Sequence, residues 1–177
     1  MIKGMEYRFK IILIGPGAVG KTSILMRFVH DTFSKSYKMT IGVDFLNKEI
    51  DIDDTNVKLT IWDVAGQKRF KFMRKNFYSG AAGALLVFDL TRETTFQEVI
   101  RRWYPEMIQF IEKEVPFILI GNKVDLIEEI GTVIDTKNAK KFAEGKRSIY
   151  IETSAKTGQN VDDAFNKLTR RMIDQAS

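Results

Sequence analysis

The stretch from Phe9 to Thr22 (FKIILIGPGAVGKT) constrains the fold more than any other part of the sequence. It opens with the apolar run Ile11 to Ile14, which is typical of a short strand covered on both faces. The segment that follows, Gly15 to Thr22, fits the pattern G-x-x-x-x-G-K-S/T. In this pattern a glycine-rich loop joins a strand to a helix and surrounds phosphate groups with backbone N–H donors. The stretch therefore predicts a strand, a phosphate-binding loop (P-loop) and the start of a helix in immediate succession.

The residue types in this loop suit phosphate chemistry. Gly15, Gly17 and Gly20 allow a tight turn in which no Cβ atom blocks the approach to a phosphate. Lys21 supplies a positive charge for the outer phosphates, and the Thr22 hydroxyl supplies an oxygen ligand for Mg²⁺. The alternative is a glycine turn that binds nothing, but the strand before it and the helix after it favour phosphate binding.

Length and composition indicate an ordinary globular domain. With 177 residues, 44% of them hydrophobic and 29% charged, we expect a single domain over residues 1–177, with residues 1–7 as an N-terminal extension. The sequence contains no cysteine, which excludes disulfides and thiolate chemistry. The net charge of +5 is too small to choose among acidic proteins, membranes and nucleic acids as partners.

The sequence shows no signal for export or membrane insertion. Its start lacks the apolar core of a signal peptide, and no apolar run approaches the ~18 residues that span a bilayer. The terminal residues Asp-Gln-Ala-Ser contain no cysteine for prenylation. We therefore expect a cytoplasmic protein, at most peripheral at a membrane, that either works without a lipid anchor or has a natural chain longer than this sequence.

Predicted strands and helices alternate along the chain. Apolar or alternating runs predict further strands at 43–52, 57–62, 84–88, 116–120 and 149–151, with the turn 53–56 between the first two. Helical spacing and caps predict helices at 21–30, 96–110 and 136–144, and from 160 onward. This order predicts an α/β fold of three layers: a mainly parallel six-stranded sheet with one antiparallel edge strand and helices on both faces.

Three local features bear on packing and on partner binding. Pro105 lies within the helical pattern of 96–110 and should bend or divide that helix. The basic segment Lys68 to Lys75 is either a solvated helix face, which we favour, or a docking surface for acidic groups. Phe45 and Trp62 fall on strand faces that are otherwise polar, which indicates either contact with a partner or packing under a neighbouring loop.

Polar residues follow the ends of several predicted strands. These residues are Asp63, Asn122, Asp125 and Ser154. In sheets of this type ligands bind beyond the carboxyl ends of the strands, which is also where the P-loop lies. We therefore expect these distant segments to meet at one site.

The residue types after the fifth and sixth strands indicate a guanine base. The Asp125 carboxylate can accept the ring N–H and the exocyclic amino group of guanine, whereas adenine offers no matching pair of donors. Asn122 can bond either the P-loop or the base. The stems of Lys123 and Lys156 can cover its faces, and the Ala155 N–H can donate to the guanine oxygen.

Taken together, these motifs resemble a Ras-superfamily small GTPase. The resemblance rests on segments 15–22, 40–45, 62–67, 122–125 and 154–156, and it covers the chain from Phe9 onward. Segments 41–45, 69–70, 77–81 and 86–89 are most similar to the Rab branch, whereas 17–22 and 103–106 are closer to Rho proteins. The resemblance implies a Rab-like G domain with the P-loop NTPase fold.

The resemblance implies a protein that binds GTP and GDP with Mg²⁺ and hydrolyses GTP slowly. Thr22, Thr40 and Asp63 would hold the metal, with Asp63 acting through water. Gln67 would orient the attacking water, and Lys21 and Thr40 would be the other catalytic residues.

The same resemblance implies contacts with the nucleotide. Phe33 would lie against the guanine edge, Tyr37 would close over the phosphates, and the Gly66 N–H would bond the terminal phosphate. The complete set of nucleotide-binding residues that we predict is Gly15, Gly17, Ala18, Val19, Gly20, Lys21, Thr22, Ser23, Phe33, Tyr37, Thr40, Gly66, Asn122, Lys123, Asp125, Ser154, Ala155 and Lys156.

The resemblance also implies partners. No arginine belongs to these motifs, so we expect an activating protein that supplies one and raises the rate by ~10³ to 10⁵. Loss of the terminal phosphate would release Thr40 and Gly66 and change how Phe45, Trp62 and Phe77 face an effector. We expect effector, activating and exchange proteins as partners, a monomer, no nucleic acid, and a role in vesicle or membrane trafficking or in signalling.

Two departures and two alternatives remain. Val64 and Lys68 stand where the family usually has threonine and glutamate, which bears on how exchange and activating proteins engage the chain. A nucleotide-bound scaffold with negligible hydrolysis is an alternative, and the presence of Gln67 argues against it. A small P-loop kinase is a second alternative, which would leave Asn122 and Asp125 without a role.

Overall fold

The computed structural model describes residues 6–36, 38–66, 71–131 and 134–177. The strands are β1 (Glu6–Ile14), β2 (Val43–Ile52), β3 (Thr55–Val64), β4 (Gly83–Asp89), β5 (Phe117–Asn122) and β6 (Ile149–Thr153). The helices are α1 (Lys21–His30), α2 (Lys71–Tyr78), α3 (Glu93–Glu98), α4 (Tyr104–Phe110), α5 (Ile127–Ile130), α6 (Thr136–Gly145) and α7 (Val161–Ala176). A π-helical stretch (Val99–Trp103) joins α3 to α4, and a 3₁₀ turn (Val124–Leu126) precedes α5.

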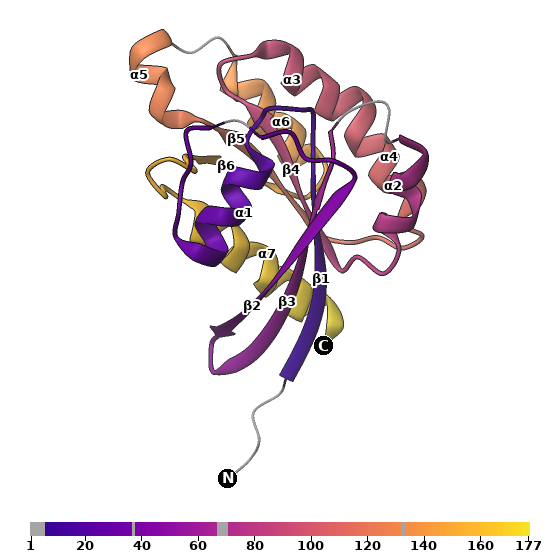
Figure 1. The fold of residues 1–177 in the computed structure, drawn as a ribbon. Coiled ribbons are helices and arrows are strands. Elements are labelled where there is room, and N and C mark those ends of the chain that lie inside the picture. Colours follow the sequence, from indigo (N-terminus) through magenta and orange to yellow (C-terminus); the bar gives the residue numbers. More distant parts are fainter. Residues whose placement is uncertain (1–5, 37, 67–70, 132–133) are drawn as a thin grey trace.

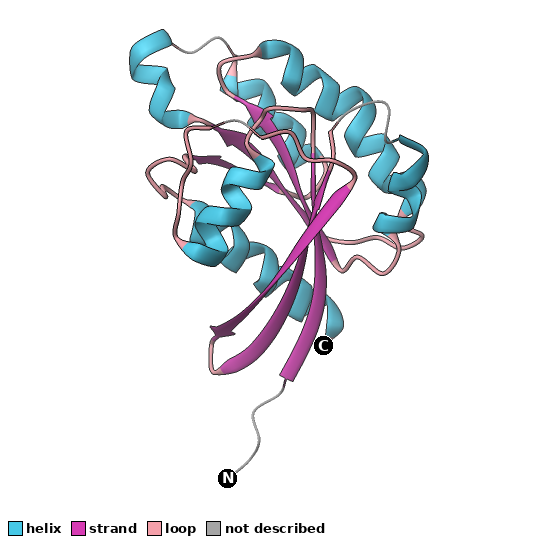
Figure 2. Cartoon of the chain, viewed as in Figure 1, coloured by secondary structure: helices cyan, strands magenta, loops and turns pink. Residues whose placement is uncertain are grey.

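The strands form a six-stranded sheet with the order β2-β3-β1-β4-β5-β6 (Figure 1). Neighbouring strands are parallel except at the edge, where β2 runs antiparallel to β3. Helices cover both faces of the sheet, as Figure 2 shows. The predicted fold class, a mainly parallel six-stranded sheet with one antiparallel edge strand, is therefore confirmed.

Successive residues of β1 pack into different layers. Ile11 and Leu13 belong to the core beneath α1 and α7, whereas Ile12 and Ile14 belong to the core beneath α2, α3, α4 and α6. All of them are fully buried. Because both faces of this second half of the strand are covered, the run Ile11 to Ile14 is apolar without alternation, whereas Glu6 to Lys10 is only partly buried. The P-loop, which follows Ile14, therefore begins at a strand end that packing on both faces holds in place.

Several strands extend beyond the apolar runs that predicted them. Asp63 lies within β3, where it pairs in register with Asp44 of β2, and Asn122 is the last residue of β5. The prediction placed both residues just after a strand. The strands continue through these polar residues because their backbone groups still bond a neighbouring strand. A hydropathy pattern does not detect backbone pairing.

The turn between β2 and β3 is shorter than predicted. Thr55 already belongs to β3 and pairs with Ile52, so the predicted turn 53–56 is wrong at its second half. Asp53 and Asp54 alone make the turn, with φ of 48° and 64°. Aspartate adopts this left-handed conformation more readily than most residues, and a two-residue turn of this kind suits the twist of an antiparallel pair.

The helical pattern of 96–110 is divided, as Pro105 predicts. In the π-helical stretch the Tyr104 N–H donates to the carbonyl of Val99, five residues earlier. Pro105 then lies in the first turn of α4, the part of an α-helix that tolerates proline best.

The basic segment 68–75 is only partly solvated. Lys75 is exposed, but Arg74 is 1% exposed and pairs with Glu106 of α4. The predicted solvated face is therefore wrong for Arg74, because its partner lies far away in the sequence. Lys68 and Arg69 lie outside the described residues.

Candidate nucleotide site

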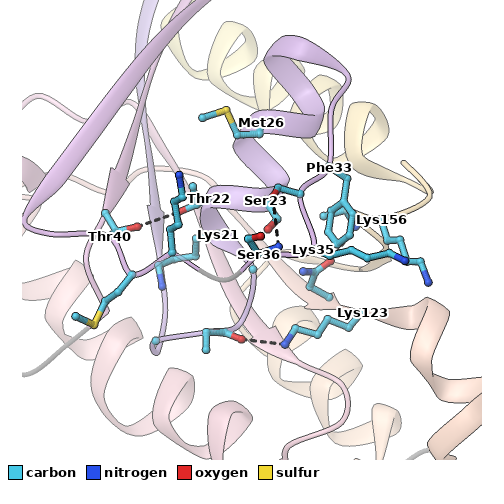
Figure 3. Close-up of a pocket in the computed structure, with 18 of the residues that line it drawn as sticks. Lys21, Thr22, Ser23, Met26, Phe33, Lys35, Ser36, Thr40, Lys123 and Lys156 are labelled. Atoms are coloured by element: carbon cyan, nitrogen blue, oxygen red, sulfur yellow. Dashed lines mark hydrogen bonds between the residues drawn. The ribbon is translucent and has the colours of Figure 1, made fainter.

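The loops at the carboxyl ends of the strands surround a pocket of about 700 Å³ (Figure 3). Its walls come from the P-loop, the start of α1, the segment 32–40, Gly66, and the loops after β5 and β6. In Figure 3 the side chains of Lys21, Thr22, Phe33, Lys123 and Lys156 gather around it. Segments from along most of the chain thus meet at one rim of the sheet.

Most of the predicted nucleotide-binding residues line this pocket. They are Gly17, Ala18, Gly20, Lys21, Thr22, Ser23, Phe33, Thr40, Gly66, Asn122, Lys123, Asp125, Ala155 and Lys156. Four other predicted site residues do not line the pocket but bond residues that do. Gly15 bonds Lys21, Val19 bonds Asn122, Asp63 bonds Thr22, and Ser154 bonds Asp125. Tyr37 and Gln67 lie outside the described residues.

The P-loop passes into α1 through Gly20. This residue has φ of +101°, and a Cβ atom at this position would collide with the side-chain nitrogen of Asn122. Only glycine fits here, because a side chain meets both an unfavourable backbone conformation and a rigid neighbour. The N-terminus of α1, with its positive dipole end, is thereby directed at the pocket.

Lys21 is a buried cation at the centre of the site. Its ammonium group donates to the carbonyl oxygens of Gly15, at 2.9 Å, and Pro16, at 2.7 Å. Burial lowers the pKa of Lys21 to about 8, although the nearby Asp63 carboxylate opposes this shift. A poorly solvated ammonium of this kind is well suited to bind an anion.

Three oxygen-bearing side chains meet beside Lys21. The Thr22 and Thr40 hydroxyls lie 2.8 Å apart (Figure 3), and both bond Oδ2 of Asp63. The other carboxylate oxygen of Asp63, Oδ1, is buried and has no hydrogen-bond partner among the described residues. Burial raises the pKa of Asp63, while hydrogen bonds from Thr22 and the charge of Lys21 lower it. Hard oxygen ligands with a buried, unsatisfied carboxylate oxygen fit a small divalent cation.

At the other end of the pocket Asn122 joins three segments. Its amide nitrogen donates to the Val19 carbonyl at 3.0 Å. Its oxygen accepts from the Thr153 hydroxyl at 3.0 Å and from the Ala155 N–H at 3.3 Å. Of the two predicted roles of Asn122, this structure shows bonding to the P-loop.

Asp125 is oriented by Ser154. The Ser154 hydroxyl donates to Oδ1 of Asp125 at 2.7 Å and accepts the Thr157 N–H at 3.0 Å. Asp125 also lines the pocket, together with Lys123 and Leu126 of the same segment. Phe33 and Lys156 lie close together on the same side of the view in Figure 3.

Sequence reasoning missed Arg27, which holds the loop after β6. Its guanidinium donates to the carbonyls of Ala155, at 2.9 Å, and Lys156, at 2.6 Å, and pairs with Asp31 at 2.8 Å. Backbone carbonyls leave no signature in a sequence, so no motif could have identified this residue. The pocket-lining residues of the segment 32–40 that were missed lie in a stretch without periodicity: Thr32, Ser34, Lys35, Ser36, Lys38 and Met39. Met26 of α1 and Leu126 were missed as well.

The predicted aromatic residues outside the pocket form a stack. The ring centroids of Phe45 and Trp62 are 5.1 Å apart, and those of Trp62 and Phe77 are 5.9 Å apart. Phe45 is 50% exposed, while Trp62 and Phe77 are partly buried. The rings therefore pack on one another and still leave an apolar surface beside the antiparallel edge of the sheet.

Comparison with known proteins gives consistent results. The model of the Ras family matches residues 10–174. The chain is 42% identical over 176 residues to the Ras-related protein Rab-1 of Theileria parva, covering 99% of this chain and 79% of that protein. It is 43% identical over 164 residues to the Ras-related protein RABA4b of Arabidopsis thaliana (93% and 72% covered). It is 42% identical over 168 residues to the Ras-related protein Rab-2B of Dictyostelium discoideum (95% and 82% covered).

Proposed function

Because this chain belongs to the Ras family, as a Rab-like GTPase that binds guanine nucleotides and hydrolyses GTP, we propose how its own residues perform this activity. The observation that carries the proposal is the convergence of Lys21, the Thr22, Thr40 and Asp63 cluster, and Asp125 around one pocket. These groups would respectively bind phosphates, a metal ion and a base. As a member of this family the protein works with effector, activating and exchange proteins.

The phosphates of GTP would lie over the P-loop. Lys21 would exchange its bonds to the carbonyls of Gly15 and Pro16 for bonds to the outer phosphates, which satisfy its charge better. Backbone N–H groups from Gly17 to Ser23 would bind the remaining oxygens. Gly66 lines the same pocket, and its N–H would bond the terminal phosphate.

The residues beside Lys21 fit Mg²⁺. Thr22 and Thr40 would bind it directly and Asp63 through water, using the oxygen atoms that now bond one another and the unsatisfied Oδ1. When bound, the ion neutralises charge on the phosphates of the substrate. Thr40 lies in the segment before β2, so its bond would tie this segment to the presence of the terminal phosphate.

The base would lie between the loops after β5 and β6. Asp125, oriented by Ser154, would accept two hydrogen bonds from guanine. Lys123 and Lys156 would cover the base, Phe33 would contact its edge, and the Ala155 N–H would donate to its oxygen.

Hydrolysis would be slow because the site supplies few positive charges to stabilise the negative charge on the phosphoryl oxygens in the transition state. Gln67 would orient the attacking water, with Lys21 and Thr40 holding the terminal phosphate. No arginine of the described residues lines the pocket. An activating protein would supply an arginine, and Gly17 leaves it room, since a Cβ atom there would meet no atom within 4 Å.

Hydrolysis would release Thr40 and Gly66 and change the surface offered to effectors. Phe45, Trp62 and Phe77 would form the apolar part of this surface, since Phe45 already exposes half of its side chain. Within the described residues no helix is long and apolar enough to cross a membrane. We propose a single-domain monomer in the cytoplasm that associates peripherally with membranes in vesicle trafficking and has no nucleic-acid partner.

Base recognition provides the sharpest test. Nucleotide extracted from the purified protein should be GDP or GTP. Asp125→Asn should weaken GDP binding about a hundredfold and strengthen binding of xanthosine diphosphate, because the amide can donate to the additional oxygen of xanthine. Asp162→Asn, at an exposed position of α7, should change neither affinity. An Asp125→Asn variant that binds GDP as tightly as the wild type would contradict the proposed site.

A further inference from the structure

Asp89, the last residue of β4, is a buried carboxylate bonded by four donor groups of three residues. Its Oδ2 lies 2.8 Å from the Lys123 ammonium and 3.0 Å from Nε of Arg92. Its Oδ1 accepts the N–H of Thr91 at 2.9 Å and the hydroxyl of the same residue at 2.7 Å. Burial of Asp89 acts against ionisation, but the hydrogen bonds from Lys123 and Thr91 outweigh it and hold the pKa below its ordinary value. Lys123 and Arg92 thus both pair with the Asp89 carboxylate, which the bonds from Thr91 hold in place.

Each of these cations also bonds the P-loop. Lys123 donates to the Ala18 carbonyl at 2.9 Å, and Nη2 of Arg92 donates to the Gly17 carbonyl at 3.2 Å. These carbonyls belong to successive residues at the tip of the loop. The bond from Lys123 is visible in Figure 3.

The tip of the loop needs such support. Ala18 has φ of +61°, a left-handed conformation that residues with a Cβ atom adopt at a cost of about 1 kcal/mol. A conformation of this kind persists only where its surroundings enforce it. Lys123 and Arg92 contact the carbonyls on both sides of the Ala18 Cα atom, which is where the chain is strained.

The two carbonyl bonds also determine where the neighbouring N–H groups point. In a trans peptide the C=O of one residue and the N–H of the next point in opposite directions. When Arg92 and Lys123 hold the carbonyls of Gly17 and Ala18, the N–H groups of Ala18 and Val19 are therefore directed to the other side of the loop. Gly17 and Ala18 line the pocket, whereas Arg92, which binds the Gly17 carbonyl, does not, so the Ala18 N–H is turned away from Arg92 toward the pocket.

We propose that Asp89 and Arg92 are positioning residues that, together with Lys123, lock the P-loop tip with its N–H groups directed at the nucleotide and thereby slow nucleotide release. This inference rests on the proposed function. Arg92 acts from behind the loop: neither it nor Asp89 lines the pocket, so Arg92 is not a catalytic arginine.

The rate at which the protein releases a fluorescent GDP analogue tests this. Arg92→Gln should speed release roughly tenfold, the effect of losing one charge-assisted hydrogen bond. Arg92→Lys keeps the charge but offers one nitrogen in place of the two with which Arg92 binds, so it should restore only part of the slow release. Arg101→Gln removes an exposed arginine from the neighbouring π-helical stretch and should release GDP like the wild type. The Arg92 side chain is 42% exposed, so these variants should fold, which thermal unfolding would verify.

A double variant tests whether the residues act as a unit. Asp89→Asn should also speed release, because Asp89 acts by holding Arg92 and Lys123. Adding Arg92→Gln to it should have little further effect, because Arg92 binds the Gly17 carbonyl in this position only while Asp89 holds its guanidinium. Unchanged release in Arg92→Gln, or fully additive effects, would overturn the proposal. So would an Arg92→Gln variant with normal release but slower single-turnover hydrolysis, which would make Arg92 catalytic. A wild-type protein that does not retain GDP would instead contradict the proposed function.

Discussion

Arg74 and Glu106 form an ion pair inside the protein, between α2 and α4. Nε of Arg74 lies 2.6 Å from Oε1 of Glu106, and Nη2 lies 2.9 Å from Oε2. The Tyr78 hydroxyl donates to Oε1 at 3.1 Å, and the Trp103 ring lies 4.6 Å from the guanidinium carbon. Burial, followed by the charge of Glu106, raises the pKa of Tyr78 well above its ordinary value, so its hydroxyl stays protonated. Because α2 follows Gly66 in the chain, this pair anchors the helix after the pocket-lining Gly66 to α4.

We expect Glu106→Gln to destabilise the protein by ~3 to 5 kcal/mol, because it leaves the Arg74 charge buried without its partner. Unfolding by urea at constant nucleotide concentration would measure this change. Lys75→Met, which replaces an exposed cation of the same helix, should change the free energy of unfolding by no more than about 0.5 kcal/mol.

Replacing both partners distinguishes a charge effect from a packing effect. Adding Arg74→Met to Glu106→Gln removes the buried charge that Glu106 no longer balances and keeps an acceptor for Tyr78, so it should recover much of the lost stability. The Arg74→Met single variant completes the comparison. If the double variant loses as much free energy of unfolding as the two single variants together, the ion pair is not the source of the effect.

The pKa of Lys21 predicts that nucleotide binding depends on pH. Below pH 8 the ammonium is charged in the free protein and in the complex, so affinity should be constant. Above pH 8 Lys21 of the free protein loses its proton. In the complex Lys21 would keep the proton, because the negative charge of the bound phosphates raises the pKa of Lys21. Affinity for GDP should then fall by up to about tenfold per pH unit.

Binding of fluorescent GDP from about pH 7 to about pH 9 would show this slope. Lys21→Arg provides the control, because a guanidinium stays charged throughout this range. The variant should bind more weakly but with a flat profile, apart from any titration of the nucleotide itself. Equal slopes in both proteins would show that Lys21 is not the titrating group.

The proposed Mg²⁺ site at Thr22, Thr40 and Asp63 predicts a matched pair of aspartate variants. Removing Mg²⁺ with a chelator should speed GDP release from the wild type, and Asp63→Asn should make release fast and much less sensitive to the chelator. Asp44→Asn removes the carboxylate of the residue that lies opposite Asp63 in the β2–β3 ladder, and it should keep the full response. A full response in Asp63→Asn would remove this residue from the metal site.

Local motifs were sufficient to predict the P-loop and the polar ends of the strands, because each depends on a few adjacent residues and on strand polarity. They were insufficient wherever the partner is distant in the chain. Arg74 belongs to a run of charges that looks solvated, and only the fold brings Glu106 to it. Arg27 and Arg92 bond backbone carbonyls, which every residue carries, so neither sequence position is distinctive. The residue types of 53–56 predicted a turn, but they did not determine its length. The length depends on the left-handed backbone conformation of Asp53 and Asp54.

Gln67 separates the GTPase from the alternative of a nucleotide-bound scaffold without hydrolysis. If it orients the attacking water, Gln67→Leu should slow single-turnover GTP hydrolysis by about tenfold or more, which corresponds to at least ~1.4 kcal/mol of transition-state stabilisation. GDP affinity should not change, because water orientation is needed only for the reaction. Gln159→Leu, an exposed glutamine before α7, should hydrolyse GTP at the wild-type rate. Equal hydrolysis by the Gln67→Leu variant and the wild type would remove the role assigned to Gln67, whereas no measurable hydrolysis in either would favour the scaffold.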